Sequence, residues 1–105
     1  MRGSHLRFYT YENRKHKGLA VYEWLLERAR DLGIHGGSAF RALAGFGHRG
    51  VMHEQHFVEL AGEQSILIEF IADEDQADQF LTLINQEELA IFWMRSEVEY
   101  GTSGS

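Results

Sequence analysis

The stretch that decides the fold reads Ser65-Ile66-Leu67-Ile68-Glu69-Phe70-Ile71. Its side chains alternate between two faces, and its β-branched and aromatic residues favour a strand. The residues after it predict a helix, because Asp73 can cap the first turn and Glu74 and Asp75 would lie where the helix dipole favours negative charge. The buried stripe expected for this helix is Ala77, Phe80, Leu81 and Ile84.

The first third of the chain shows the same order of strand and helix. Residues 5–11 alternate, so that Leu6, Phe8 and Thr10 share one face and Arg7, Tyr9 and Tyr11 share the other. The polar residues 12–18 interrupt this strand. Apolar residues then recur at helical spacing over 19–32, and Gly33 suits the position just past a helix C-terminus, where positive φ is common.

The remaining segments complete a sheet. Residues 38–44 are ambiguous by propensity, and we predict a strand because glycines bracket the segment. A Gly- and His-rich loop follows over 45–55, with a short strand extension over 56–60. Residues 90–100 alternate as a last strand. The order β-α-β-β-α-β predicts an α+β, ferredoxin-like fold: a four-stranded antiparallel sheet with two helices on one face.

Length and composition narrow the classes of function. A chain of 105 residues forms one domain, with a core expected over about 5–100 and both ends resembling added or disordered sequence. The net charge of −6 predicts no nucleic-acid partner. The lack of cysteine fits a reducing cytoplasm, and the lack of an apolar run of about 20 residues predicts no membrane insertion.

Two helices can cover only one face of such a sheet, so the other face is predicted to be open. We place Phe92, Met94 and Val98 on the helix side and the alternate residues of the last strand on the open side. The open face would then carry Tyr9, Tyr11, Leu67, Ile71, Ile91 and Trp93, interleaved with Arg7, Glu69, Arg95 and Glu97. A contiguous apolar patch of this kind marks an interface, which predicts a homo-oligomer packed through this face.

The first candidate site is a basic run that precedes the first predicted helix, consisting of Arg14, Lys15, His16 and Lys17. Side-chain charge and free backbone N–H groups at a helix start can attract a phosphate or a carboxylate. The alternative is a solvated turn, since charged loop runs are common.

The second candidate is the glycine-rich stretch Gly45-Phe46-Gly47-His48-Arg49-Gly50. Three glycines let the backbone turn sharply and approach a ligand, while His48 and Arg49 supply donors and charge. It is not a Walker loop, because the Gly-Lys-Ser/Thr ending is missing. Glycine spacing alone supports a hairpin connection as well as a binding loop.

Three histidines, His48, His53 and His56, could together hold a metal ion. Their spacing matches no metal signature, so hydrogen bonds within the loop or subunit contacts are the commoner use. No nucleophile and base suggest catalysis, and Glu87-Glu88 looks like a solvated helix end. We expect a binding protein rather than an enzyme, with an enzyme on the same scaffold as an alternative.

Several stretches resemble the PII-like proteins catalogued as domain of unknown function 190. The resemblance runs from about Leu6 to Tyr100 and is most specific at Gly45-Phe46-Gly47-His48 followed by Met52-His53. It implies a homotrimer that is similar to PII nitrogen-signalling proteins and binds ligands in clefts between subunits. Gly45, Phe46 and Gly47 would then lie beside the ligand.

The resemblance implies a regulatory protein that binds a small anion, with a nucleotide as one candidate, and signals through the 46–56 loop. It also suggests a context near fluoride export, with a membrane transport protein as the regulatory target. The sequence departs from PII proteins at residues 86–89, where Glu87 and Glu88 replace a phosphate cradle and would repel a triphosphate. A histidine-based metal- or ion-responsive module is the alternative function.

Overall fold

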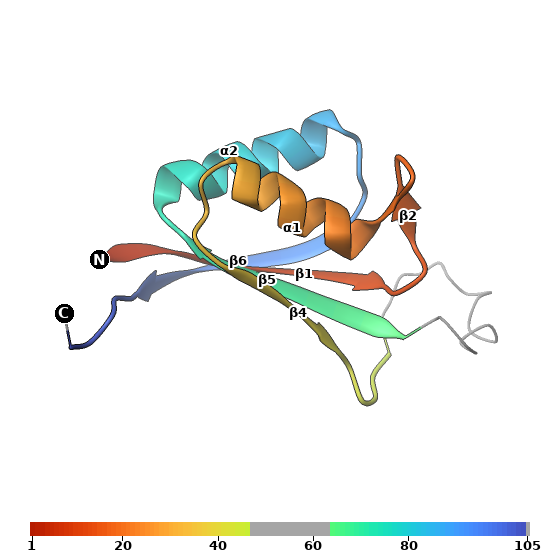
Figure 1. The fold of residues 1–105 in the computed structure, drawn as a ribbon, viewed down its shortest axis with the longest axis horizontal. Helices are drawn as coiled ribbons and strands as arrows, with labels where there is room; N and C mark the ends of the chain where they lie inside the picture. The colour runs from red at the N-terminus through yellow and green to blue at the C-terminus, as the bar shows by residue number, and fades with distance from the viewer. Residues whose placement is uncertain (47–63, 105) are drawn as a thin grey trace.

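The protein is described by a computed structural model that covers residues 1–46 and 64–104. Within these ranges the chain forms a four-stranded sheet, a two-stranded hairpin and two helices (Figure 1). The sheet consists of β1 (Arg2–Tyr11), β4 (Gly37–Arg41), β5 (Ser65–Ala72) and β6 (Phe92–Glu99). Its order is β4-β5-β1-β6, and all neighbouring pairs are antiparallel.

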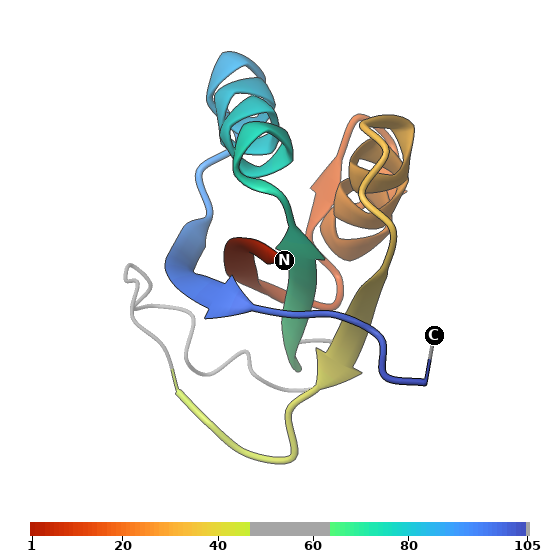
Figure 2. The same cartoon turned by 90° about the vertical axis from the view of Figure 1, so that its left-hand side faces the viewer.

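Both helices lie on the same face of the sheet. Figure 2 shows α1 (Val21–Asp31) and α2 (Glu74–Gln86) side by side above the strands. This arrangement confirms the predicted α+β, ferredoxin-like architecture. No helix in residues 1–46 or 64–104 is long and apolar enough to cross a membrane.

The core fills the space between the helices and the sheet. Phe8, Phe70 and Phe80 pack edge to face at its centre, with ring centroids 5.3–6.0 Å apart. This geometry is preferred by aromatic rings. The predicted stripe of α2 is confirmed for Ala77, Phe80 and Ile84, which are buried, while Leu81 is partly buried.

The helix boundaries follow from local chemistry. The side chain of Asp73 accepts a hydrogen bond from the backbone N–H of Gln76 at 2.7 Å, and the side-chain oxygen of Gln76 accepts one from the N–H of Asp73. This capping box begins α2 as predicted. Gly33 has a φ of 86° just past α1, as expected for a residue that ends a helix.

Several element boundaries differ from the prediction. The first strand begins at Arg2 rather than residue 5, and Ser4 is buried in it. The strand predicted over 38–44 runs from Gly37 to Arg41. The helix predicted from residue 19 begins at Val21, because Leu19–Ala20 (β3) pairs with Lys15–His16 (β2) in a small hairpin. The first strand and the turn of this hairpin lie in residues 12–18, which were predicted only to interrupt the first strand of the sheet.

The predicted faces of the last strand are wrong by one residue. Trp93 pairs with Phe8 and Arg95 pairs with Leu6, which places both on the helix side of the sheet. Arg95 is held there because its guanidinium donates to Glu74 at 2.6 Å and to Asp78 at 2.9 Å.

The same phase correction applies to the other residues of that strand. Glu97 pairs with Ser4, and Ile91 packs against the core, so neither belongs to the open face. Phe92 and Met94 occupy that face instead, opposite Tyr9 and Arg7. An alternation in which both sets of residues contain an aromatic side chain does not reveal its own phase.

Candidate functional site

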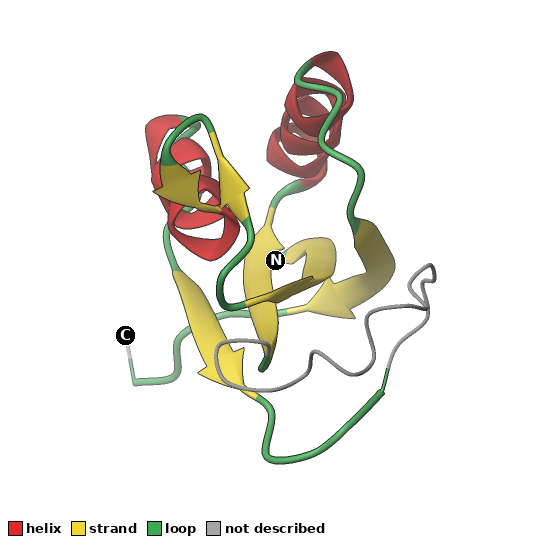
Figure 3. Cartoon of the chain, turned by 90° about the vertical axis from the view of Figure 1, so that its right-hand side faces the viewer, coloured by secondary structure: helices red, strands yellow, loops and turns green. Residues whose placement is uncertain are grey.

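The predicted basic run forms the β2–β3 hairpin. Figure 3 views the molecule from the end at which this hairpin stands beside α1. Its turn contains Lys17 and Gly18, with φ values of 52° and 84°. The backbone N–H of Val21 donates to the carbonyl of Arg14 at 2.8 Å, which closes the hairpin at the start of the helix. Lys15, His16 and Lys17 thus lie in the hairpin and Arg14 directly precedes it, and their role in binding a ligand stays a prediction.

The C-terminal end of α2 contacts this hairpin. The Glu87 carboxylate lies 2.9 Å from Nε2 of His16 and 3.0 Å from Nζ of Lys17. The hydrogen bond with His16, and then that with Lys17, lowers the pKa of Glu87 below its ordinary value. Glu87 is therefore an anion engaged by the basic run, and its prediction as a solvated helix end is wrong. Glu88, the next residue, is exposed.

The His16 ring packs against a side chain of the first helix. It packs edge to face against Trp24, with ring centroids 4.9 Å apart. Trp24 is buried, and the Arg28 guanidinium stands 5.9 Å from the centroid of its ring. A ring packed in this way has few alternative orientations, so Nε2 is held toward Glu87.

The glycine-rich stretch begins at the same end of the domain. Beyond β4, the backbone N–H of Ala42 donates to the carbonyl of Ser65, and that of Glu12 donates to Gln64, both at 2.9 Å. The Glu12 carboxylate accepts a hydrogen bond from Arg41 at 2.5 Å. The residues that enter and leave the loop are thus tied to the segment that links β1 to the hairpin.

Only the start of the predicted binding loop is described. Gly45 and Phe46 follow β4, and the side chains of Phe46 and Leu43 are fully exposed, at 99% and 104%. No side chain in residues 1–46 or 64–104 covers these two large apolar groups. The other predicted loop residues, Gly47, His48, Arg49, His53 and His56, lie outside the described residues, as does the predicted strand extension over 56–60.

The open face divides into two halves. The half near the hairpin end is aromatic, because Tyr9 and Phe92 lie ring to ring at 5.7 Å and Phe40 pairs with Leu67 across β4 and β5. The half near the chain termini is charged. There Glu69 accepts from His5 at 3.0 Å and from Arg7 at 3.3 Å, and these contacts lower its pKa.

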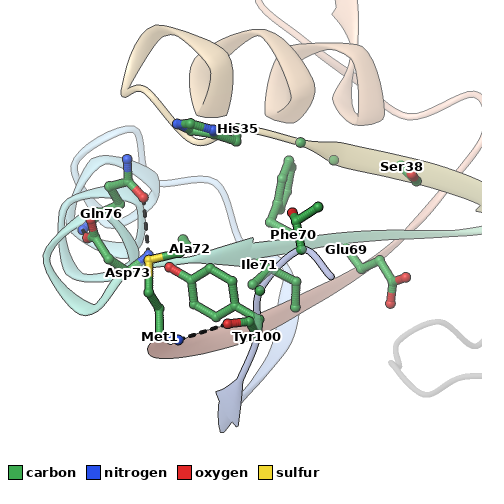
Figure 4. Close-up of a pocket in the computed structure, with 14 residues that line it drawn as sticks. Met1, His35, Ser38, Glu69, Phe70, Ile71, Ala72, Asp73, Gln76 and Tyr100 are labelled. Carbon is green, nitrogen blue, oxygen red and sulfur yellow. Dashed lines mark hydrogen bonds between the residues drawn. The ribbon is translucent and has the colours of Figure 1, made fainter. Parts of the chain in front are cut away.

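A separate cavity of about 700 Å³ lies at the opposite end of the molecule, near the two termini (Figure 4). Its lining includes His35, Ser38, Gln76 and Tyr100. Two carboxylates border it, but Asp73 is engaged as the cap of α2 and Glu69 is engaged by His5 and Arg7. Among the residues predicted to bind a ligand, those that the structure describes do not line this cavity.

The predicted metal ligands lie outside the residues that the structure describes. In the described parts of the chain, no group of three or more histidine, cysteine, aspartate or glutamate side chains could hold a metal ion. The prediction for His48, His53 and His56 therefore stays a prediction.

The fold is similar to that of solved PII-like proteins. A protein from Thermus thermophilus, solved as a candidate PII-like signaling protein, matches with a TM-score of 0.65 and 21% identity, over 92% of this chain and 87% of that one. CPII from Thiomonas intermedia K12, bound to ADP and bicarbonate, matches with a TM-score of 0.63 and 22% identity, over 97% and 91% of the two chains.

Sequence comparison identifies the family. A UPF0166 protein from Aquifex aeolicus (strain VF5) is 33% identical over 76 residues, which is 72% of this chain and 72% of that protein. The model of the DUF190 family, described as uncharacterized ACR, matches residues 3–95. The resemblance seen in the sequence is thereby confirmed, and the chain belongs to the DUF190 family.

Proposed function

We propose that this chain is a PII-like regulatory protein that binds a small anion in clefts between the subunits of a homo-oligomer. The observation that carries the proposal is the meeting of the basic hairpin and the loop base at one end of the domain. Lys17 offers its ammonium there with its side chain 66% exposed, in a chain whose net charge is −6. A local cationic site on an acidic protein favours an anionic ligand over a nucleic acid or a membrane surface.

The apolar surfaces support an oligomer, with a trimer as the expected state. Leu43 and Phe46 are fully exposed beside the loop, and the aromatic half of the open face carries Tyr9, Phe40 and Phe92. Exposed patches of this kind mark protein interfaces. Packing a second subunit against them would enclose the hairpin end and make a cleft there.

The ligand candidates are a nucleotide and bicarbonate. CPII, which shares the fold, holds ADP and bicarbonate. For this chain we favour an adenine nucleotide whose phosphate meets Lys15 and Lys17, beside the backbone of Gly45 and Phe46. Ligand binding would be reported by the 46–56 loop to a partner, and a membrane transport protein is the proposed target. The role is binding rather than catalysis, and the cytoplasm is the proposed location.

A ligand screen tests the proposal. Thermal unfolding would be followed with AMP, ADP, ATP, bicarbonate and fluoride, each as its sodium salt with sodium chloride as the control for ionic strength. A ligand that binds only the native state stabilises it by RT ln(1 + [L]/Kd) and so raises the melting temperature. We expect at least one of these anions to raise it. No shift with any of them would contradict the proposal.

A further inference from the structure

Glu87 occupies the basic hairpin as an anionic ligand would. One carboxylate oxygen is within 3.0 Å of both His16 Nε2 and Lys17 Nζ. The contact is partly enclosed, because the Glu87 side chain is 22% exposed and that of His16 is 16% exposed. Lys17, one of the two lysines that the proposed function assigns to the ligand, is therefore already paired with a group of the protein itself.

A carboxylate at position 87 does not stabilise the second helix. Glu87 is the C-cap residue of α2, where the aligned backbone dipoles place partial negative charge. A carboxylate is unfavourable at this position, and the last turn of α2 contains no basic residue to offset it. The only compensating charges among its described contacts come from the hairpin, 71 residues away in sequence for His16.

Two unusual backbone conformations flank the contact. In the described parts of the chain, Lys17 and Glu88 are the two residues other than glycine with positive φ, at 52° and 55°. Such conformations are uncommon for residues with a side chain. One follows His16 in the hairpin and the other follows Glu87 in the helix exit. Each side of the ion pair is thus followed directly by a residue in the left-handed region.

We infer that Glu87 is a specificity-determining residue: its carboxylate competes with the ligand for His16 and Lys17 and so limits the negative charge of the anion that can bind. The inference rests on the proposed function. A ligand phosphate that contacts Lys17 shares this ammonium with the Glu87 carboxylate or displaces it, and in both cases the carboxylate lies close to the bound anion. Each further phosphate adds charge and repulsion, so AMP and ADP are favoured over ATP.

Substitution of Glu87 by glutamine separates charge from shape. Glu87→Gln keeps an oxygen that can accept a hydrogen bond from His16 and removes the negative charge. Glu88→Gln is the matched control, because it removes the same charge from an exposed neighbour in the same turn. Affinities for AMP, ADP and ATP would be measured by isothermal titration calorimetry for both variants and the wild type, without divalent metal.

We expect E87Q to raise the affinity for ATP on the order of tenfold relative to AMP, since a like charge within a few ångströms is removed. E88Q should leave the ratio of the two affinities within about twofold of the wild type, because its charge is screened by water. If Glu87 only fixes the hairpin, E87Q would change the affinity for all three nucleotides by the same factor. That result would overturn the inference.

A second variant covers the case in which E87Q does not fold. Lys17→Gln removes an exposed side chain, so the fold should persist. K17Q should weaken ATP more than AMP, and an equal effect on both would overturn the inference.

The wild-type result separates this inference from the proposed function. If the wild type binds bicarbonate but neither it nor E87Q binds any nucleotide, the inference fails and the proposed function stands. If neither protein binds any of these anions, both fail.

Discussion

Tyr9 and Phe92 lie ring to ring across β1 and β6, with centroids 5.7 Å apart, on the face of the sheet opposite the buried Phe8 and therefore opposite both helices. Both rings are exposed, at 39% and 63%. An aromatic pair on an uncovered sheet face is costly to leave in water. This relationship places the proposed interface on the aromatic half of the open face.

Phe92→Gln is therefore expected to weaken the oligomer. It removes the more exposed ring of the pair without adding charge. Trp93→Gln is the matched control, since Trp93 is the next residue, is also exposed, and faces the helix side. Size-exclusion chromatography with light scattering should show a lower mass for F92Q at micromolar concentration and the wild-type mass for W93Q. Loss of mass in W93Q alone would place the interface on the other side.

Gly37→Ala should destabilise the fold by about 1–3 kcal/mol, a typical cost of overpacking. A Cβ at Gly37 would overlap the ring of Phe70, and that ring is buried and cannot move aside easily. Gly36→Ala is the control, because a Cβ there would meet no atom within 4 Å. Urea denaturation of the three proteins measures the difference. Equal free energies of unfolding for G37A and G36A would contradict the packing described.

Thr10→Val should raise the free energy of unfolding by about 1 kcal/mol. Thr10 is 5% exposed, and its hydroxyl is the one buried side-chain polar atom without a hydrogen-bond partner in the described residues. Valine has nearly the same shape and removes an unsatisfied group. Thr82→Val, at an exposed position of α2, should change stability by less than about 0.5 kcal/mol. A T10V protein less stable than the wild type would show that the hydroxyl is satisfied in solution.

The stability difference between wild type and Glu69→Gln should depend on pH. Hydrogen bonding to His5, and then to Arg7, lowers the folded-state pKa of Glu69 below its ordinary value of 4.5. A carboxyl with a depressed pKa contributes stability above the unfolded-state pKa and loses it as pH falls through the folded-state pKa.

Wild type should therefore exceed E69Q in stability at pH 6, and the gap should close as the pH falls below about 4.5. Urea denaturation between about pH 3 and pH 6, at one protein concentration, measures the gap. Glu97→Gln is the control, since Glu97 is 71% exposed and lies 3.7 Å from Arg2. A gap for E69Q that does not vary with pH would mean that the carboxylate gains nothing from His5 and Arg7.

The fold could be predicted because its signals are local. The alternation over 65–72 and the caps at Asp73 and Gly33 each involve residues within a few positions of one another. These signals locate β5, the start of α2 and the end of α1, whereas β4 was predicted only from the glycines that flank it. The phase of β6 was not predictable in this way, because it depends on the contacts of Arg95 with Glu74 and Asp78, which lie 21 and 17 residues away.

The candidate site was predictable in composition and not in arrangement. The basic run is visible in the sequence, and Lys17-Gly18 is a turn signal that could have revealed the hairpin. The contact between His16 and Glu87 spans 71 residues, and no local pattern encodes it. Glu87, which was predicted to be a solvated acid, is the group that pairs with His16 and Lys17 of the predicted site.

The measurement that tests the central claim most directly is native mass spectrometry of the wild type titrated with ADP. The proposed function predicts a complex of three chains that takes up one ADP per chain, with no nucleotide on any monomer that is present. A mass of a single 12.1 kDa chain throughout, or an oligomer that takes up no ADP, would contradict nucleotide binding at subunit clefts.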